Sequence, residues 1–523
     1  MPNAHEKTVF LETFGCQMNV LDSELVVGAL RGLGYALTEQ RDAADVILFN
    51  TCSVRQQAED KVYGRLGDVK RVKRERPDVV VGVIGCMAER DGEDLLKRYP
   101  QVDLMCGPAE LDKVPLLIDN VLKTREPALA LQNGKSGGAS GGGARRSSTL
   151  AAAKDDLELL DLSRSMSPDA AGAHNNSAYV RITRGCNKFC TYCVVPYTRG
   201  AEVHRPPDHI VAECRQLAEA GITEVTLLGQ TVNHYLYDHG AAISMEGVQQ
   251  PQVGPGGKAF KQSQQYAAGR KLTTFANLLK RIHDEVPAIQ RLRFVTSYPR
   301  DFGDDILQVM AESERICNYL HVPAQHGSDR VLKLMNREYT IGEYYAFIER
   351  ARSFMPDVQI ASDFIVGFPT ETEAEFQTNK EVIRRCQFKN SFIFKYSPRP
   401  GTIAIDRFAD DVPDAVKRRR NAELLEVQAE VSQQVHDAIV GQTVQVKVEG
   451  VSKKGMKQRQ QGNVELRWEH GEEVTQLSGR TRGDLIVMFD GSEELVGKLV
   501  DVNVQTAKPL TLFGELAGQP AAV

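Results

Sequence analysis

The stretch Arg184-Gly-Cys-Asn-Lys-Phe-Cys-Thr-Tyr-Cys193 brings three cysteines, Cys186, Cys190 and Cys193, together in one short segment. Thiolate is the usual protein ligand of iron–sulfur clusters, so three cysteines on one loop can hold three irons of a four-iron cluster. The fourth iron then has no protein ligand, and an open metal position can bind a small molecule. A zinc site is the alternative, but it normally needs a second pair of ligands close by. The spacing therefore favours a four-iron cluster with one open iron.

Around this segment the chain alternates short apolar runs with stretches of helical periodicity. This alternation predicts a partial (β/α)6 barrel over residues 178–407, in which catalytic groups lie at the carboxyl ends of the strands. The cysteine loop follows the first strand and so falls at such an end. The polar, Gly- and Gln-rich segment 238–269 is expected to be a surface insertion. The expected strands are Tyr179–Thr183, Glu224–Leu228, Arg291–Thr296, Tyr319–Val322, Gln359–Val366 and Ser391–Tyr396.

Residues 7–131 show the same alternation of apolar runs and helical stretches. Thr8–Glu12, Val46–Asn50 and Val79–Ile84 indicate short buried strands. The predicted structure is an α/β domain with a doubly wound parallel sheet.

A cysteine follows closely on each of these three strands: Cys16, Cys52 and Cys86. Ligands of open parallel sheets bind beyond the carboxyl ends of the strands, so the three thiols should converge at one edge. This placement predicts a second cluster site. The alternative is three unrelated buried thiols, because cysteine is often buried and inert. Cys106 lies farther along and fits the pattern less well.

The rest of the chain divides into three further segments. Residues 132–177 are Gly- and Ser-rich and are expected to form a flexible linker. Their Gly-Lys-Ser is not a phosphate-binding loop, because no buried strand leads into it. Residues 408–440 predict a connecting helix, and the β-rich runs of 441–517 predict a small all-β barrel. The predicted fold class is thus α/β with a small all-β domain at the end.

The composition limits the class of protein. With 523 residues and 42% hydrophobic residues, the chain should form several globular domains. No apolar run is long enough to span a membrane, and no apolar signal segment begins the chain, so a cytoplasmic protein is expected. A net charge of −5 excludes a uniformly basic nucleic-acid coat. Any RNA contact must come from local basic runs, for which the candidates are Lys70–Arg74, Lys417–Arg420 and Lys453–Arg459.

Five motifs taken together identify a family. They are Glu12-Thr-Phe-Gly-Cys-Gln-Met-Asn19, Asn50-Thr-Cys-Ser-Val-Arg55, Gly85-Cys-Met-Ala-Glu-Arg90, the cysteine loop continued through Val-Pro-Tyr-Thr-Arg-Gly200, and His321-Val-Pro-Ala-Gln-His-Gly-Ser-Asp329. In this order they resemble the radical S-adenosylmethionine (radical SAM) methylthiotransferases. Within that family they are most similar to the tRNA branch, the 2-methylthio-isopentenyladenosine synthases.

The resemblance implies two [4Fe-4S] clusters and S-adenosylmethionine as cofactors. It assigns an auxiliary cluster to Cys16, Cys52 and Cys86 of the N-terminal domain, and the radical SAM cluster to Cys186, Cys190 and Cys193 of the central barrel. It also identifies the C-terminal barrel as an RNA-binding TRAM domain. Expected contacts to S-adenosylmethionine are Tyr192 near the adenine and, at strand ends, Gly229, Gln230, Ser297, Gln325 and Gly367. The glycines among them could instead serve tight turns.

The reaction implied by the resemblance is transfer of a methylthio group to carbon 2 of N6-(dimethylallyl)adenosine next to the anticodon in tRNA. The implied partners are an electron donor, such as flavodoxin or ferredoxin, and a sulfur donor. The chain is expected to be a monomer and to bind no membrane.

Two other interpretations remain open at this point. The nearest is a methylthiotransferase that acts on a ribosomal-protein aspartate or on threonylcarbamoyladenosine in tRNA. The isopentenyl-tRNA branch is favoured by three sequence motifs, Cys-Gln-Met-Asn, Cys-Ser-Val-Arg and Val-Pro-Tyr-Thr-Arg-Gly. An interpretation from another class is a noncatalytic iron–sulfur electron carrier or RNA-binding protein, which would not need an open iron in a barrel.

Overall fold

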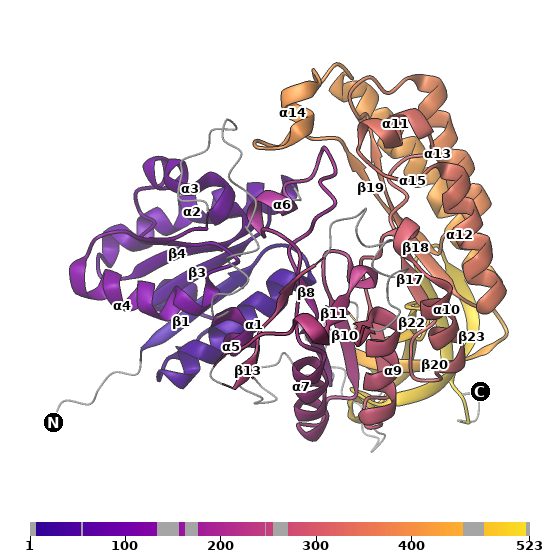
Figure 1. Ribbon diagram of the computed structural model, residues 1–523, viewed down its shortest axis with the longest axis horizontal. Helices are drawn as coiled ribbons and strands as arrows, with labels where there is room; N and C mark the ends of the chain where they lie inside the picture. Colours follow the sequence, from indigo (N-terminus) through magenta and orange to yellow (C-terminus); the bar gives the residue numbers. More distant parts are fainter. Residues whose placement is uncertain are drawn as a thin grey trace, which may run out of the picture.

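The computed structural model describes residues 7–53, 56–132, 156–162, 176–245, 247–254, 270–452 and 475–518. Figure 1 shows an N-terminal α/β domain on the left, a barrel-like domain beside it and a small yellow barrel at the lower right. Most of the predicted linker and the basic run Lys453–Arg459 lie outside the described residues.

The N-terminal domain contains a parallel sheet with the strand order β2-β1-β3-β4-β5-β6. Strands β3 and β4 are buried along their whole length, as expected for strands covered by helices on both faces. The predicted doubly wound sheet is therefore present. The strands are β1 (Thr8–Thr13), β2 (Ala36–Leu37), β3 (Val46–Thr51), β4 (Val80–Gly85), β5 (Leu104–Cys106) and β6 (Ala128–Ala130).

Helices cover both faces of this sheet. Apolar side chains of α1 and α4 pack on one face, and those of α2 and α3 pack on the other. Each helix returns the chain to the start of the next parallel strand, so all strand carboxyl ends meet at one edge. The helices are α1 (Gln17–Gly32), α2 (Gln56–Glu75), α3 (Cys86–Arg98) and α4 (Val114–Thr124).

A short helix inside the predicted linker corrects the expectation that residues 132–177 are flexible throughout. Helix α5 (Asp156–Leu162) packs Leu157 and Leu160 into the core of the N-terminal domain. Its acidic side chains are buried because they pair with arginines of the central domain. The ion pairs are Glu158–Arg205 at 2.9 Å and Asp161–Arg181 at 2.7 Å.

The central domain is the predicted partial barrel. Its strands form two parallel three-stranded sheets, β7-β10-β16 and β17-β18-β19, which a bridge between Leu292 and Ile316 joins. All six expected strands are present, with ends that differ by a few residues. They are β7 (Ser177–Arg181), β10 (Glu224–Leu228), β16 (Arg291–Phe294), β17 (Tyr319–His321), β18 (Gln359–Val366) and β19 (Asn390–Lys395).

Helices cover the outside of the partial barrel and complete its β/α units (Figure 1). They pack apolar faces against the strands, and the resulting core continues around the barrel. The covering helices are α7 (Pro207–Glu219), α9 (Phe275–Glu285), α10 (Asp304–Glu312), α12 (Ile341–Phe354) and α13 (Glu373–Cys386).

Part of the predicted surface insertion is built into the domain. Strand β14 (Gln252–Val253) pairs antiparallel with β9 (Val203–His204), which in turn pairs with β8 (Thr183–Arg184) beside the cysteine loop. Gln250 is 4% exposed. The expectation that the insertion lies entirely on the surface is therefore wrong for this segment, since backbone pairing draws it against the barrel.

The C-terminal part begins with the predicted connecting helix, α15 (Asp414–Asp437). A closed barrel with the strand order β20-β21-β22-β24-β23 follows, as predicted. In the described segments no helix combines the length and apolarity that crossing a membrane requires. The barrel strands are β20 (Thr443–Val451), β21 (Thr475–Thr481), β22 (Ile486–Gly491), β23 (Leu499–Lys508) and β24 (Thr511–Leu516).

The small barrel docks at the amino-terminal ends of the central strands, opposite to the cysteine loop. Arg291 and Arg293 at the start of β16 donate to backbone carbonyls of the small barrel, at 2.6 Å to Arg480 and 2.6 Å to Thr481. Burial lowers the pKa of Lys389 at this interface to about 8, although Asp484 opposes the shift at 2.6 Å. Charged side chains thus close the lower end of the central barrel.

Candidate active site

The three N-terminal cysteines lie beyond the ends of three adjacent strands, β1, β3 and β4. Gly15, with φ +147°, allows the turn after β1 to approach β3: a side chain there would place Cβ 2.7 Å from Cβ of Cys52. Asn19 fixes the same turn, because its side-chain amide donates to Asn50 Oδ1 at 3.0 Å and its oxygen accepts from Cys16 Sγ at 3.3 Å. The turn therefore places Cys16 beside Cys52.

Cys86 completes this N-terminal triad at the start of α3. Burial raises the pKa of its thiol to about 11; Arg199 opposes the rise, and the neighbouring Cys52 and Cys16 add to it. Two buried thiols and a half-buried one, whose charges would repel one another, are costly to ionise together without a cation. A bound metal cluster would replace their protons, so the residues present fit such a group.

The second triad, Cys186, Cys190 and Cys193, forms a tight loop at the end of β8. The Cys193 N–H donates to the Cys190 carbonyl at 3.0 Å, and the Cys186 N–H donates to the Gly200 carbonyl at 3.2 Å. Burial is the main reason that the pKa of Cys186 rises to about 12, and Glu202 and Cys190 add to the rise. Burial, followed by Cys190 and Cys186, also raises the pKa of Cys193. The second triad thus has the same chemical character as the first.

Neither triad is as compact as a site for a single metal ion. Among the described residues, one group of three or more His, Cys, Asp or Glu side chains has all its ligand atoms within 4.8 Å of one another: Glu202, His204 and His234. A tetrahedral zinc with Zn–S bonds of about 2.3 Å would need sulfurs closer together than that limit. A cube of four irons spaces its thiolates more widely, so the cysteine geometry favours clusters over zinc.

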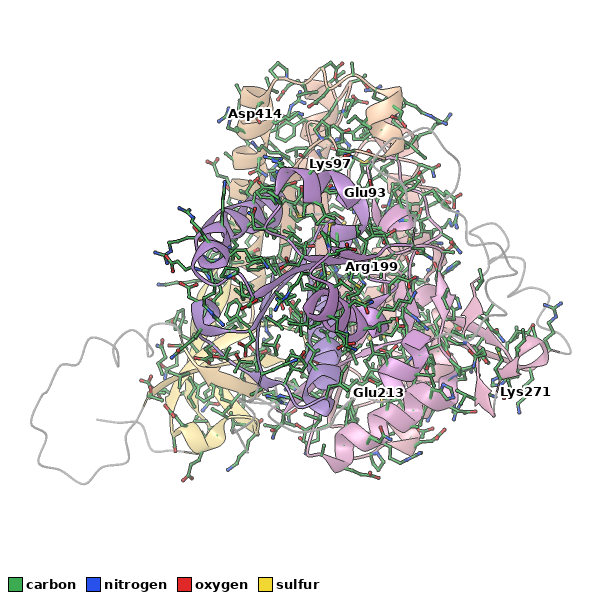
Figure 2. The ribbon with its side chains drawn as sticks, turned by 90° about the vertical axis from the view of Figure 1, so that its left-hand side faces the viewer. Glu93, Lys97, Arg199, Glu213, Lys271 and Asp414 are labelled. Carbon is green, nitrogen blue, oxygen red and sulfur yellow. The ribbon has the colours of Figure 1, made fainter. Side chains whose placement is uncertain are left out.

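Each triad receives one hydrogen bond from an arginine, the buried Arg199 in one case and the half-buried Arg337 in the other. Arg199 Nε donates to Cys86 Sγ at 3.2 Å, and Arg337 Nη1 donates to Cys190 Sγ at 3.4 Å. Figure 2 shows Arg199 where the N-terminal domain meets the central domain. The sequence analysis missed both roles. Arg199 stands inside the Val-Pro-Tyr-Thr-Arg-Gly motif, which was a usable signal, whereas no motif marks Arg337.

Arg199 also joins the two domains through a buried carboxylate. Asp22 of α1 accepts from Arg199 at 2.8 Å with one oxygen and from Arg181 at 3.0 Å with the other. The side chain of Asp22 is fully buried. Arg199 contacts Cys86 of the N-terminal triad, and the carbonyl of the next residue, Gly200, accepts from the Cys186 N–H of the barrel triad. Two consecutive residues thus connect the triads.

The predicted strand-end contacts lie on the same side of the barrel as the cysteine loop. Ser297 follows β16 and is 4% exposed, and its hydroxyl oxygen has no hydrogen-bond partner among the described residues. The same is true of the hydroxyl of Thr183. Gly229 packs directly over Thr183, where any side chain would collide, and Gln230 follows it half-buried. Two buried hydroxyls without partners are the expected state of a pocket that binds a polar ligand.

Three further predicted contacts complete this end of the barrel. Gln325 has φ +68° and pairs through its backbone with β18, while Gly367 has φ +71° directly after that strand. The Gly367 N–H donates to Glu371. Tyr192 is half-buried and packs against an apolar cluster that includes Phe368. These positions share one end of the barrel, and the positive φ of Gly367 also supports the simpler explanation of a turn.

The basic run Lys417–Arg420 is not a free phosphate-binding surface. Lys417 and Arg420 are buried, where Lys417 pairs with Asp410 at 2.5 Å. The remaining pairs are Arg418–Asp414, Arg419–Glu373 at 2.6 Å and Arg420–Glu371 at 3.1 Å. Lys417 and Arg420 are therefore committed to contacts inside the protein, whereas Arg418 and Arg419 stay 69% and 45% exposed, so contact of this run with RNA stays a prediction for these two residues.

The run Lys70–Arg74 on α2 is only partly paired. Lys73 contacts Asp103 at 2.7 Å and Arg71 contacts Asp42 at 3.4 Å, while Lys70, Arg71 and Arg74 are exposed. This run remains a candidate contact to phosphates.

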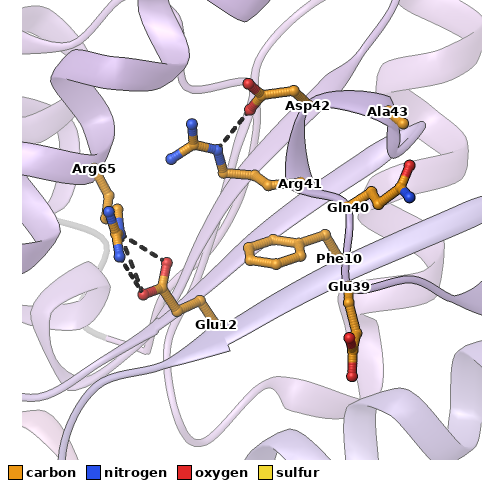
Figure 3. A pocket seen from close by; sticks show the side chains of 8 residues that line it. All are labelled: Phe10, Glu12, Glu39, Gln40, Arg41, Asp42, Ala43 and Arg65. Atoms are coloured by element: carbon orange, nitrogen blue, oxygen red, sulfur yellow. Dashed lines mark hydrogen bonds and ion pairs between the residues drawn. The ribbon is translucent and has the colours of Figure 1, made fainter. Parts of the chain in front are cut away.

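A cavity of about 700 Å³ lies on the N-terminal domain away from both triads. Its charged side chains pair with one another, as Figure 3 shows for Arg65 and Glu12, 3.0 Å apart. None of the cysteines or strand-end residues lines it, so the cavity is not part of the candidate active site. The lining residues are Phe10, Glu12, Glu39, Gln40, Arg41, Asp42, Ala43 and Arg65.

Comparison with known proteins gives two family matches. Residues 8–107 match "Uncharacterized protein family UPF0004", and residues 180–382 match "Radical SAM superfamily". A tRNA-2-methylthio-N(6)-dimethylallyladenosine synthase from Rhodopirellula baltica is 41% identical over 98% of this chain and 95% of its own length. Enzymes with the same name from Syntrophotalea carbinolica and Chromobacterium violaceum are 36% and 37% identical over 97% of the chain and 99% and 98% of their lengths.

The chain belongs to the tRNA-2-methylthio-N(6)-dimethylallyladenosine synthase family. The family predicted from the five motifs is thereby confirmed, and its members are radical SAM enzymes, which sets aside a noncatalytic carrier. A solved structure, the radical S-adenosylmethionine methyltransferase TsrM from Kitasatospora setae, is 13% identical with a TM-score of 0.49, over 76% of this chain and 74% of that one.

Proposed function

We infer that this protein adds a methylthio group to carbon 2 of N6-(dimethylallyl)adenosine next to the anticodon in tRNA. One observation carries this conclusion: within a chain that matches family members over nearly its whole length, two triads of buried and half-buried cysteines lie at strand ends and are joined through Arg199. Its cofactors are [4Fe-4S] clusters and S-adenosylmethionine, as in the family.

The residues of each triad are proposed to hold one cluster. Cys186, Cys190 and Cys193 would hold the radical SAM cluster, and Cys16, Cys52 and Cys86 would hold the auxiliary cluster. When bound, these groups supply the electron that cleaves S-adenosylmethionine and the site from which sulfur is transferred. Support comes from the burial of the thiols, their mutual effect on pKa and their spacing.

Side chains around the barrel loop would keep it in place for this chemistry. Lys188, between the first two loop cysteines, forms a buried ion pair with Asp301, and its ammonium lies 4.6 Å from the ring centre of Tyr298. Arg337 stacks on the same ring, also at 4.6 Å, while donating to Cys190. A loop fixed from two sides can present its open position to a substrate in one orientation.

The strand-end residues are proposed to bind S-adenosylmethionine. The hydroxyls of Ser297 and Thr183 can each donate one hydrogen bond to a polar group of the ligand, which would supply the partners that they otherwise lack. Gly229 and Gln230 would contact the same ligand through the backbone and the amide, and Gln325, Gly367 and Tyr192 would complete the pocket.

The substrate is proposed to reach this pocket as a splayed base. A nucleotide of a single-stranded loop can be unstacked at lower cost than one in a duplex, and an apolar dimethylallyl group favours a pocket without water. The C-terminal barrel is proposed to bind RNA through its outward surface, because its charged side chains that face the central domain, Lys447, Arg482 and Asp484, are used in docking. An external electron donor such as flavodoxin or ferredoxin, a sulfur donor, a monomeric state and a cytoplasmic location complete the proposal.

The function is tested by mass spectrometry of nucleosides after reaction of purified, anaerobically reconstituted enzyme. Isopentenylated tRNA should gain the methylthio group, whereas unmodified tRNA, threonylcarbamoylated tRNA and the ribosomal protein should react poorly. Preferred modification of either of the last two substrates would move the chain to a neighbouring activity of the methylthiotransferases.

The separate roles proposed for the two triads are tested with alanine variants. Replacement of Cys16, Cys52 and Cys86 should abolish methylthio transfer but preserve cleavage of S-adenosylmethionine. Cys106→Ala is the matched control, since that buried thiol at the end of β5 donates to the Glu110 carbonyl at 3.0 Å. It should retain both reactions. Loss of cofactor cleavage in the folded triple variant would contradict the assignment.

A further inference from the structure

Besides the two cysteine triads, a further potential metal site lies next to the barrel cysteine loop. Glu202, His204 and His234 are 0–1% exposed, and their ligand atoms all lie within 4.8 Å of one another. Glu202 Oε1 is 2.7 Å from His204 Nε2 and 2.5 Å from His234 Nδ1. Three elements contribute: the turn before β9, β9 itself and the short 3-10 helix Val232–His234 that follows β10.

The surroundings of His204 suit a metal ligand. Its Nδ1 lies 2.7 Å from the Leu236 carbonyl and its Nε2 lies 2.7 Å from a Glu202 oxygen. A neutral imidazole has only one N–H and cannot donate to both oxygens. The Leu236 N–H also points at Nδ1, but at the longer distance of 3.0 Å. A doubly protonated ring would donate to both oxygens; a metal ion on Nε2 would equally leave Nδ1–H to donate to the Leu236 carbonyl, as metal-binding histidines usually donate their other N–H to a carbonyl or carboxylate.

The carboxylate of Glu202 also has an unsatisfied oxygen. Glu202 Oε2 is buried and has no hydrogen-bond partner among the described residues. A buried carboxylate oxygen without a partner is costly, and a metal ion held by one or both oxygens removes that cost.

We propose that Glu202, His204 and His234 bind one divalent transition-metal ion, of which zinc(II) fits the ligands best. Two imidazoles and one carboxylate form a donor set that zinc binds in proteins. The ion would be structural, because Glu202 is two residues from Gly200, whose carbonyl accepts from the Cys186 N–H. It would tie the cysteine loop to the turn after β10. This site is independent of the proposed methylthio transfer.

The insertion closes this site. Gly254 lies so near that an added Cβ would stand 2.6 Å from His204 Nε2 and 3.2 Å from Glu202 Oε1. Its N–H donates to the Glu202 carbonyl at 2.8 Å. Gly254→Ala should therefore fill the metal position without removing a ligand.

The test is metal analysis of the full-length protein after anaerobic cluster reconstitution and dialysis against zinc chloride. We expect one zinc per chain in addition to cluster iron. X-ray absorption at the zinc edge should show nitrogen and oxygen ligands at about 2.0–2.2 Å and no sulfur at about 2.3 Å. Zinc with sulfur ligands, or no zinc, would overturn the proposal, and this measurement needs no variant.

Variants locate the ion. His234→Gln and Gly254→Ala should each lose zinc while keeping the iron content of the wild type, which also shows that the variants are folded. His283→Gln, on the outer helix α9, is the matched control and should keep its zinc. Retention of zinc in both site variants would assign the ion elsewhere and reject the site.

Discussion

At the scale of single residues, the two arginines that contact thiols are the least expected part of the site. A positive charge and a donor beside a sulfur favour the more negative, reduced form of an iron–sulfur cluster, so they raise its reduction potential. Arg199 and Arg337 each contact a different triad. If each triad holds one cluster, as proposed, the two clusters can be tuned separately.

Arg199→Gln should lower the reduction potential of the auxiliary cluster. We expect a shift of roughly 60 mV, the one-electron equivalent of about 1.4 kcal/mol, since a hydrogen bond to a charged group contributes about that much. Redox titration monitored by electron paramagnetic resonance measures it, in protein whose barrel cysteines are replaced by alanine so that one cluster remains.

Arg337→Gln, in protein with all six cysteines, is the matched variant for Arg199→Gln. It should shift the radical SAM cluster and leave the auxiliary cluster unchanged. An unchanged auxiliary potential in Arg199→Gln would show that the contact to Cys86 is only structural.

Ser297→Ala should weaken binding of S-adenosylmethionine. The Ser297 hydroxyl is buried without a partner at the open end of the barrel, and one neutral hydrogen bond is worth up to about tenfold in affinity. Equilibrium dialysis with the reconstituted enzyme gives the dissociation constant. Ser313→Ala is the control, because that serine is equally buried but precedes β17 at the opposite end. Equal affinities of the two variants would remove Ser297 from the pocket.

At the scale of helices and strands, the elements that could be predicted are those whose sequence pattern lies within one short segment. The apolar runs of β1, β3 and β4 and the cysteines after them were predictable, because strand, turn and thiol are neighbours in sequence. Helix α5 was not, since its acidic residues are buried only through arginines that follow it by 20 residues or more. Strand β14 is two residues long and has no alternation to detect. The role of Arg337 depends on a contact 147 residues away in sequence.

Asp161→Asn should loosen α5. Asp161 is 2% exposed and binds Arg181 at 2.7 Å, and removal of its charge leaves the buried guanidinium with Asp22, at 3.0 Å, as its remaining carboxylate. The expected cost is up to about 3 kcal/mol. A lower melting temperature and faster hydrogen exchange in residues 156–162 would show this loss. Glu39→Gln, on the surface of the N-terminal domain, should change neither quantity. Unaltered exchange in α5 would mean that apolar packing alone holds the helix.

At the scale of the whole molecule, many of the basic side chains form ion pairs inside the protein instead of facing solvent. Arg399 and Arg90 both pair with the buried Glu59, so the N-terminal domain is held to the central domain at a second point besides Asp22. The small barrel occupies the opposite end of the central strands. The carboxyl-terminal edges of two sheets thus adjoin, and their orientation is fixed by these charged contacts together with apolar packing, in which Leu228 of the central domain joins the N-terminal core.

Asp484→Asn should destabilise the docking of the small barrel without affecting the active-site end. Asp484 has φ +63°, a conformation that asparagine tolerates, so the substitution changes charge and little else. It leaves the buried Lys389, 2.6 Å from Asp484, without a carboxylate, while Arg480 keeps its pair with Glu449 at 3.0 Å. The expected loss is about 3 kcal/mol, measured by calorimetry at neutral pH.

The same contact gives a pH dependence with a definite sign. Burial alone would raise the pKa of Asp484, but Lys389, Arg480 and Arg293 together hold it below the usual value of 3.8. Its contribution to stability is therefore present above about pH 4 and is lost as the pH falls through the lowered value. Wild type should lose this contribution on acidification, whereas Asp484→Asn should not. Asp490→Asn, at an exposed position of β22, is the control. If Asp484→Asn melted like wild type at neutral pH while keeping its cleavage of S-adenosylmethionine, the ion pairs would not be what holds the small barrel in place.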